Sequence, residues 1–138
     1  MAHIITLNAQ LIIELFLIFS VIPKKRVRIS SGGNLSTKEG LVEVWMQGEW
    51  GTVCDDSLIN RDSIYEKGKK AAKVICKSLG HASGVPIQTK KNGGGHGTIW
   101  LDEVQCNGNE TSLFDCNYKT SYVQNDCNHD EDFSVKCS

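Results

Sequence analysis

The chain has 138 residues, of which 22% are charged and 40% hydrophobic, and its formal net charge is −1. This length suffices for one domain with a modest core and is too short for two comfortable ones. The balanced charge gives no electrostatic reason to expect nucleic-acid binding, and the ordinary composition excludes collagen-like and disordered chains.

The cysteines indicate the compartment. None of the six lies in the first 53 residues; they are Cys54, Cys76, Cys106, Cys116, Cys127 and Cys137. An even number of cysteines in a small domain is typical of a disulfide framework formed in an oxidising environment. The sequence contains no CxxC pair of the kind that zinc sites use. The spacing therefore favours disulfides over a zinc site, but it does not choose among the possible pairings.

The N-terminal residues 11–22 form an apolar run interrupted by Glu14. The run is shorter than the roughly 20 residues of a transmembrane helix, and its length suits the core of a signal peptide. Basic residues follow the run rather than precede it, so an uncleaved anchor would leave the cysteines in the cytosol. We therefore expect residues 1–23 to be a signal peptide or a non-domain segment, with an upstream remnant or a misplaced gene start as alternatives. Residues 26–138 are expected to form the domain.

Alternating apolar residues predict short strands. Residues 27–30 form the first, and residues 41–46 and 49–53 form a hairpin whose first strand has Val42, Val44 and Met46 on one face. Further strands are expected at residues 98–104 and 133–137, with a short helical turn at residues 111–116. Residues 31–34 and 92–97 have the composition of loops.

One helix is predicted over residues 66–79. Ala72, Ile75 and Leu79 recur at helical spacing, and Gly80 stands where a glycine commonly ends a helix. Gly68 weakens the prediction for the first turn. One helix with several short strands indicates an α+β fold.

Five ordered segments resemble the scavenger receptor cysteine-rich (SRCR) domain over about residues 26–138. They are GLVEVWMQGEWGTVCDD at residues 40–56, VICKSLG at 74–80, IWLDEVQC at 99–106, ETSLFDC at 110–116 and CNHDEDFSVKC at 127–137. Two departures from the family pattern are a longer stretch around residues 59–67 and Phe133-Ser134 in place of the usual Ala-Gly pair. Both fall where they affect loop shape rather than the framework.

The resemblance implies a fold and a disulfide pairing. Six cysteines are the number found in group A of this family, whose fold is a curved antiparallel β-sheet cradling one α-helix. The implied pairs are Cys54–Cys127, Cys76–Cys137 and Cys106–Cys116.

The resemblance also implies a cation site. In similar SRCR domains, acidic residues at the positions of Asp55, Asp56 and Glu110 hold a divalent cation used in ligand binding. Calcium prefers several oxygen ligands, so we predict a Ca²⁺ site there, with Asp62 and Asp102 as weaker candidates for a neighbouring site. The alternative is that Asp55 caps one turn and Glu110 begins the next.

Charge is segregated along the chain. Residues 61–91 carry eight basic and two acidic side chains, and residues 101–138 carry eight acidic and two basic ones. One interpretation is a basic face that binds polyanions through Lys69, Lys70 and Lys73; the other is a solvated helix surface beside an acidic tail. Asn34 and Asn109 begin sequons for N-glycosylation.

No catalytic motif appears, because disulfides account for every cysteine and no GxSxG-type sequence surrounds a serine. We predict an extracellular, non-enzymatic module for polyanions or protein partners, secreted or on the outer face of the plasma membrane. Any membrane attachment would come through an anchor or a parent protein. The alternatives are an accessory domain of a larger receptor or enzyme, such as a protease or lysyl oxidase homologue, and a structural spacer without a ligand.

Overall fold

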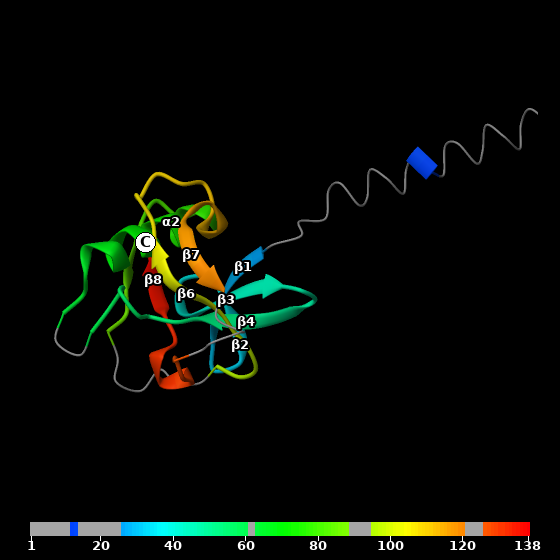
Figure 1. Ribbon diagram of the computed structural model, residues 1–138. Helices are drawn as coiled ribbons and strands as arrows, with labels where there is room; N and C mark the ends of the chain where they lie inside the picture. Colours follow the sequence, from blue (N-terminus) through cyan, green and yellow to red (C-terminus); the bar gives the residue numbers. More distant parts are fainter. Residues whose placement is uncertain (1–11, 14–25, 61–62, 89–94, 121–125) are drawn as a thin grey trace, which may run out of the picture.

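The computed structural model describes residues 12–13, 26–60, 63–88, 95–120 and 126–138 (Figure 1). Its strands are β1 (Arg26–Ser31), β2 (Asn34–Ser36), β3 (Glu39–Met46), β4 (Glu49–Val53), β5 (Gly84–Pro86), β6 (Ile99–Gln105), β7 (Asn117–Thr120) and β8 (Ser134–Cys137). Its helices are α2 (Glu66–Ser78) and the 3₁₀ turns η1 (Leu113–Asp115) and η2 (His129–Glu131).

The predicted N-terminal signal segment lies outside the described residues, apart from Ile12 and Ile13. Its role remains a prediction. Within the described ranges, no helix has the length and apolar character needed to cross a membrane.

The sheet is curved and mixed. Its strand order is β2-β1-β3-β4-β6-β7, and β8 joins it by pairing with β3 and with β5 (Figure 1). All pairs are antiparallel except β4 with β6, where Thr52 pairs with Ile99 and Val53 with Leu101 in parallel register. The expected α+β fold is confirmed, but the sheet is not wholly antiparallel. The long excursion between β4 and β6, which contains α2, permits this parallel pair because the chain returns from the same end.

The two faces of the sheet follow from alternation along β3. Val42, Val44 and Met46 are buried against the core, as their period of two predicts, while the residues between them face the opposite side. β1 continues this pattern, since Ile29 pairs with Val42 and is itself buried. The sheet therefore has one core face and one outer face.

α2 covers the core face and contacts β5, β6 and β8. The buried residues on it include Ala72 and Ile75, which the helical spacing predicted, and also Cys76. Leu79 differs: it is the C-cap residue and is 36% exposed, because the helix ends before the last predicted position turns inward. Gly80 has the left-handed φ of 92° expected of a glycine that ends a helix.

Strands β2, β5 and β7 and the turn η2 were not predicted. Each has three or four residues, too few to show a hydrophobic period, and tertiary pairing holds them in place. β5, for example, pairs through Val85 with Lys136 of β8. The helical turn expected within residues 111–116 is η1.

The three disulfides have the pairing that the resemblance implied. Cys54–Cys127 joins the end of β4 to the C-terminal segment, Cys76–Cys137 joins α2 to β8, and Cys106–Cys116 closes a short loop between β6 and η1. Cys76 and Cys137 are 0% and 3% exposed, so this second bridge lies within the core.

Gly68 provides a test of helix packing. A Cβ at this position would lie 2.3 Å from the carbonyl oxygen of Leu58, a backbone atom that cannot move away easily. We expect Gly68→Ala to lower the free energy of unfolding by about 1–3 kcal/mol, despite the higher helix propensity of alanine. Denaturant unfolding of the oxidised protein measures the change. Ser78→Ala, at the exposed end of the same helix, serves as the control, and a Gly68→Ala variant more stable than the wild type would contradict this packing.

Candidate functional site

Asp55 and Asp56 directly follow Cys54, where three parts of the chain meet. The Cys54 amide donates to the carbonyl of Leu101 in β6 over 2.8 Å, and the Asp55 amide donates to the carbonyl of Glu131 over 2.7 Å. The Cys54–Cys127 disulfide joins the same segments covalently. These bonds fix the start of the β4–α2 loop beside β6 and η2.

Asp56 and Asp102 lie together at this junction. A carboxylate oxygen of each falls in a group, with the sulfur atoms of Cys54 and Cys127, whose members are all within 4.8 Å of one another. Asp56 Oδ2 and Asp126 Oδ1 each lie 3.6 Å from Cys127 Sγ. Because both sulfur atoms belong to a disulfide, the ligand atoms available to a cation are carboxylate oxygens. We call Asp55, Asp56, Asp102, Asp126 and Glu131 the acidic cluster.

The surroundings of the acidic cluster disfavour the ionised form of its carboxyl groups. Burial, followed by the neighbouring carboxylates of Asp56 and Glu131, raises the pKa of Asp55 to about 7. Burial and nearby carboxylates also raise the pKa of Asp56, and burial raises the pKa of Asp102. Crowded carboxylates disfavour each other's ionisation, so a proton or a bound cation would relieve the repulsion.

Glu110 occupies a different position. Its carboxylate oxygens accept hydrogen bonds of 2.8–3.2 Å from the amides of Asn107, Gly108 and Asn109, and it lies beside the Cys106–Cys116 disulfide. Slight burial raises the pKa of Glu110, but these amide donors outweigh that effect and lower it overall. The structure thus groups Asp56 with Asp102 and uses Glu110 to close a turn. Asp62, the remaining predicted ligand, lies outside the described residues.

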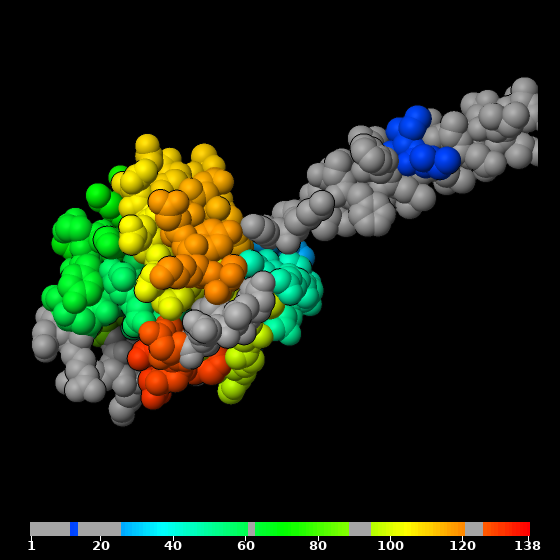
Figure 2. Space-filling model, viewed as in Figure 1, coloured from blue at the N-terminus to red at the C-terminus, as the bar shows by residue number. Residues whose placement is uncertain are grey.

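A lysine borders the acidic cluster. Lys119 of β7 pairs across the sheet with Asp102 of β6, and its Nζ lies 2.8 Å from a carboxylate oxygen of Glu103. The hydrogen bond to Glu103 and the surrounding carboxylates raise the pKa of Lys119. Sequence reasoning missed Lys119 and Asp126, because only the β6–β7 register and the Cys54–Cys127 bridge bring them here. Figure 2 shows the residues from β6 to β7 (yellow to orange) beside the C-terminal residues (red) on one face.

His129, the first residue of η2, connects η2 to the segment that precedes β6. Its Nδ1 is 2.9 Å from Asp132 Oδ2 and its Nε2 is 3.0 Å from the carbonyl oxygen of Gly97. The Gly95 amide donates to the same Asp132 oxygen over 3.2 Å. Burial raises the pKa of Asp132, while Thr52 and His129 lower it in part. His129 thus has a structural role in these contacts.

The three predicted polyanion-binding lysines lie on the solvent side of α2. Lys69 makes an ion pair of 3.0 Å with Glu66, while Lys70 and Lys73 make no ion pair with any residue the structure describes. The side chain of Lys70 lies beside Gly108, next to the exposed sequon residue Asn109. A glycan on Asn109 would therefore stand next to this lysine face. Asn34 is likewise exposed.

Residues 31–138 match the family model of the scavenger receptor cysteine-rich domain. The chain belongs to the SRCR family. Among curated relatives, it is 43% identical to the mouse macrophage receptor MARCO over 83% of the chain and 41% identical to lysyl oxidase homolog 2 of Xenopus laevis over 86% of the chain. The six cysteines in three disulfides agree with the six-cysteine type of SRCR domain.

Two solved SRCR domains have the same fold. The third SRCR domain of murine neurotrypsin has a TM-score of 0.64 and 38% identity, covering 82% of this chain and 95% of that domain. The dimeric form of the mouse MARCO SRCR domain has a TM-score of 0.57 and 34% identity, covering 86% of this chain and 92% of that one.

The comparisons support a receptor-type module rather than a catalytic one. The SRCR domain is a non-catalytic module found in receptors and, in some relatives, beside an enzyme domain. The chain spans 19% of the mouse MARCO sequence and 14% of the Xenopus lysyl oxidase homolog 2 sequence. The activities of those whole proteins therefore do not transfer to this domain.

The raised pKa of Asp55 predicts how stability depends on pH. Because the folded pKa of about 7 exceeds the ordinary 3.8, the folded chain holds this proton more tightly than the unfolded chain. Stability is therefore lost as the pH rises between these two values. Without added cations, we expect Asp55→Asn to raise the free energy of unfolding above about pH 7 and to change it little near pH 4, as urea unfolding at each pH measures.

Glu110→Gln is the control of opposite sign. The lowered pKa of Glu110 means that its carboxylate stabilises the fold above its unfolded pKa and loses that effect as the pH falls through its folded pKa. This variant should therefore be less stable than the wild type at neutral pH and similar to it in acid. An Asp55→Asn variant that is destabilised at neutral pH would contradict the electrostatic description of the acidic cluster.

Proposed function

We propose that this domain is an extracellular recognition module that binds polyanionic or protein ligands with the help of calcium. The observation that supports the calcium part is the convergence of Asp56 and Asp102 beside the Cys54–Cys127 disulfide. The disulfides support an oxidising, extracellular location, since such bonds rarely persist in the cytosol. The relationship to a macrophage receptor supports a role in recognition.

The donor set of the acidic cluster suits calcium. Its available ligand atoms are carboxylate oxygens, which hard divalent cations prefer over the nitrogen and sulfur ligands of zinc. Asp56 and Asp102 would hold the ion, with Asp55 beside them, and bound calcium would offset the repulsion that raises their pKa values. A cation held partly exposed at a surface can also accept an anionic group from a ligand. Glu110 remains a predicted calcium ligand, and the Glu110→Gln variant described below tests this role.

The polyanion part of the proposal rests on α2. Lys69, Lys70 and Lys73 project from the exposed face of α2, and anionic polymers bind such clusters through several weak, salt-sensitive contacts. This surface and the acidic cluster carry opposite charges. A polyanion would contact the lysines directly and the acidic cluster only through calcium.

One alternative has specific support, and a second is an outcome of the binding tests. The match to a short part of lysyl oxidase homolog 2 favours an accessory domain within a larger enzyme, and a flanking catalytic domain in the source gene would establish it. A structural spacer would carry neither the cation nor a ligand. Absence of calcium binding together with absence of polyanion binding would favour the spacer.

Isothermal titration calorimetry tests the calcium site. We expect the wild type to bind Ca²⁺ and Asp56→Asn and Asp102→Asn each to weaken binding by about tenfold or more, since each removes a charged ligand. Lys119→Met should strengthen binding, because it removes a positive charge beside the acidic cluster. Asp130→Asn, outside the cluster, is the matched control.

Equal heats from the wild type and from Asp56→Asn would contradict the calcium proposal. Glu110→Gln distinguishes two roles for that residue. Weakened calcium binding with an unchanged free energy of unfolding would assign Glu110 to the cation. Lower stability with unchanged binding would assign it only to the turn.

Heparin affinity chromatography tests the basic surface. We expect a Lys69→Gln, Lys70→Gln, Lys73→Gln variant to elute from immobilised heparin at lower salt than the wild type, because fewer cations contact the polymer. A control with the same loss of three charges replaces Arg26, Lys38 and Lys136 with glutamine; these residues are exposed and lie off α2. Retention unchanged by the helix substitutions would contradict a polyanion-binding role for this face.

A further inference from the structure

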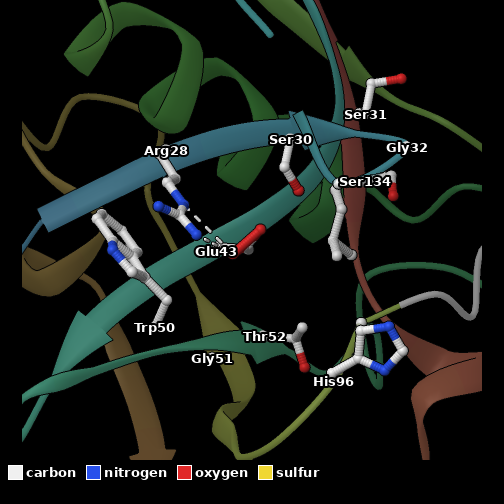
Figure 3. A pocket seen from close by; sticks show the side chains of 14 residues that line it. Arg28, Ser30, Ser31, Gly32, Glu43, Trp50, Gly51, Thr52, His96 and Ser134 are labelled. Atoms are coloured by element: carbon white, nitrogen blue, oxygen red, sulfur yellow. Dashed lines mark hydrogen bonds and ion pairs between the residues drawn. The ribbon is translucent and has the colours of Figure 1, made fainter. Parts of the chain in front are cut away.

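A polar groove lies on the outer face of the sheet, opposite the core face (Figure 3). Its volume is about 630 Å³, which falls within the range of roughly 300–1,000 Å³ common for small-molecule sites. Its walls come from β1, β3 and β4, from Ser134 at the start of β8, and from Gly95 and His96 before β6. It is separate from the acidic cluster, which shares no residue with it.

Unpaired hydroxyl groups line this groove. Ser30 and Ser134 are 7% and 2% exposed, yet neither hydroxyl has a hydrogen-bond partner among the residues that the structure describes. Thr52, 2% exposed, also lines the groove. Its Oγ1 is buried and lies beside the Asp132 carboxyl, whose pKa it lowers, so it faces that carboxyl rather than a ligand in the groove. The hydroxyls of Ser30 and Ser134 are not among the buried unpaired atoms, so they open into the groove, where each can exchange hydrogen bonds with a polar ligand.

The charged residues in the groove neutralise each other. Arg28 donates from Nε and from a terminal nitrogen to Glu43 Oε2, over 3.3 and 2.8 Å. The other oxygen, Glu43 Oε1, has no partner within the described part of the chain and remains an acceptor. The Arg28 guanidinium also lies 3.9 Å from the centre of the Trp50 ring. The groove therefore presents little net charge to an anion and an open acceptor to a hydroxyl donor.

The floor of the groove over β3 is a paired sheet face. At residues 43–45, β3 pairs with β1 on one side and with β4 on the other, so its backbone groups are already used. A peptide that binds by strand addition needs an unpaired strand edge, which β3 does not offer there. The recognition groups on offer are hydroxyls and one carboxylate oxygen.

We propose that this groove binds a neutral saccharide unit. Sugar hydroxyls both donate and accept, so adjacent hydroxyls on one ring can donate to Glu43 Oε1 and exchange hydrogen bonds with Ser30 and Ser134. Leu41 and Trp50 provide apolar surface for the C–H groups of the sugar ring. This site needs no calcium and lies on different strands from the lysines of α2, so it is independent of the function proposed above.

The test is an NMR titration of the oxidised, ¹⁵N-labelled chain with methyl α-D-mannopyranoside, methyl β-D-galactopyranoside and N-acetylglucosamine, in EDTA. We expect at least one of them to shift the amide signals of Ser30, Glu43 and Ser134. The Ser30→Ala and Ser134→Ala variants should each weaken that binding several-fold, and the double variant about tenfold, because each loses a hydrogen bond to the ligand. Ser78→Ala, which removes a hydroxyl from α2, should bind as the wild type does.

Three results would overturn the proposal. They are no shift in the groove with any of the sugars, equal binding by the double variant, and shifts confined to the acidic cluster. The amide spectra of the variants show whether each retains the fold, and the single variants replace the double one if it does not. EDTA keeps the outcome separate from the calcium site, so either proposal can fail without the other.

Discussion

The Cys54–Cys127 disulfide is the constraint on which the arrangement of this domain depends. Of the three bridges it spans the longest sequence separation, 73 residues. In the chain-entropy model, a crosslink over such a loop lowers the entropy of the unfolded chain and so stabilises the fold by about 4 kcal/mol. Hydrogen bonds on either side continue the connection: the Phe133 amide donates to Val53 and the Val42 amide to Phe133. Phe133, fully buried, thereby joins the middle of β3 to the end of β4.

The same constraint creates the acidic cluster. Asp56 and Asp126 are far apart in the sequence, yet each has a carboxylate oxygen 3.6 Å from Cys127 Sγ. Bringing them together works against folding, because burial and mutual repulsion raise the carboxyl pKa values. The covalent framework tolerates this unfavourable charge. Such a balance is common at binding sites, where stability is given up for an arrangement of groups that a ligand completes.

The domain presents three surfaces of different chemistry. The acidic cluster lies where β4, β6 and the C-terminal segment meet, the lysines lie on α2, and the neutral groove lies on the outer face of the sheet. They are built from different elements, so a change in one need not disturb the others. Ser134, a departure from the usual small residue of the family, contributes a hydroxyl to the groove and so distinguishes this chain at that surface.

The sequence alone determined the framework. Alternation in residues 41–46, helical spacing around Ile75 and the segments around the cysteines predicted the hairpin, the helix, the family and the disulfide pairs. Local periodicity could not reveal the parallel β4–β6 pair or the short strands, because long-range pairing decides them. Only the tertiary structure shows that Asp56 lies with Asp102 and that Lys119 lies beside them. It alone also shows that the Glu110 carboxylate accepts hydrogen bonds from the backbone of a turn. The physical reason is that such contacts depend on register and crosslinks, which bring together side chains that sequence spacing does not relate.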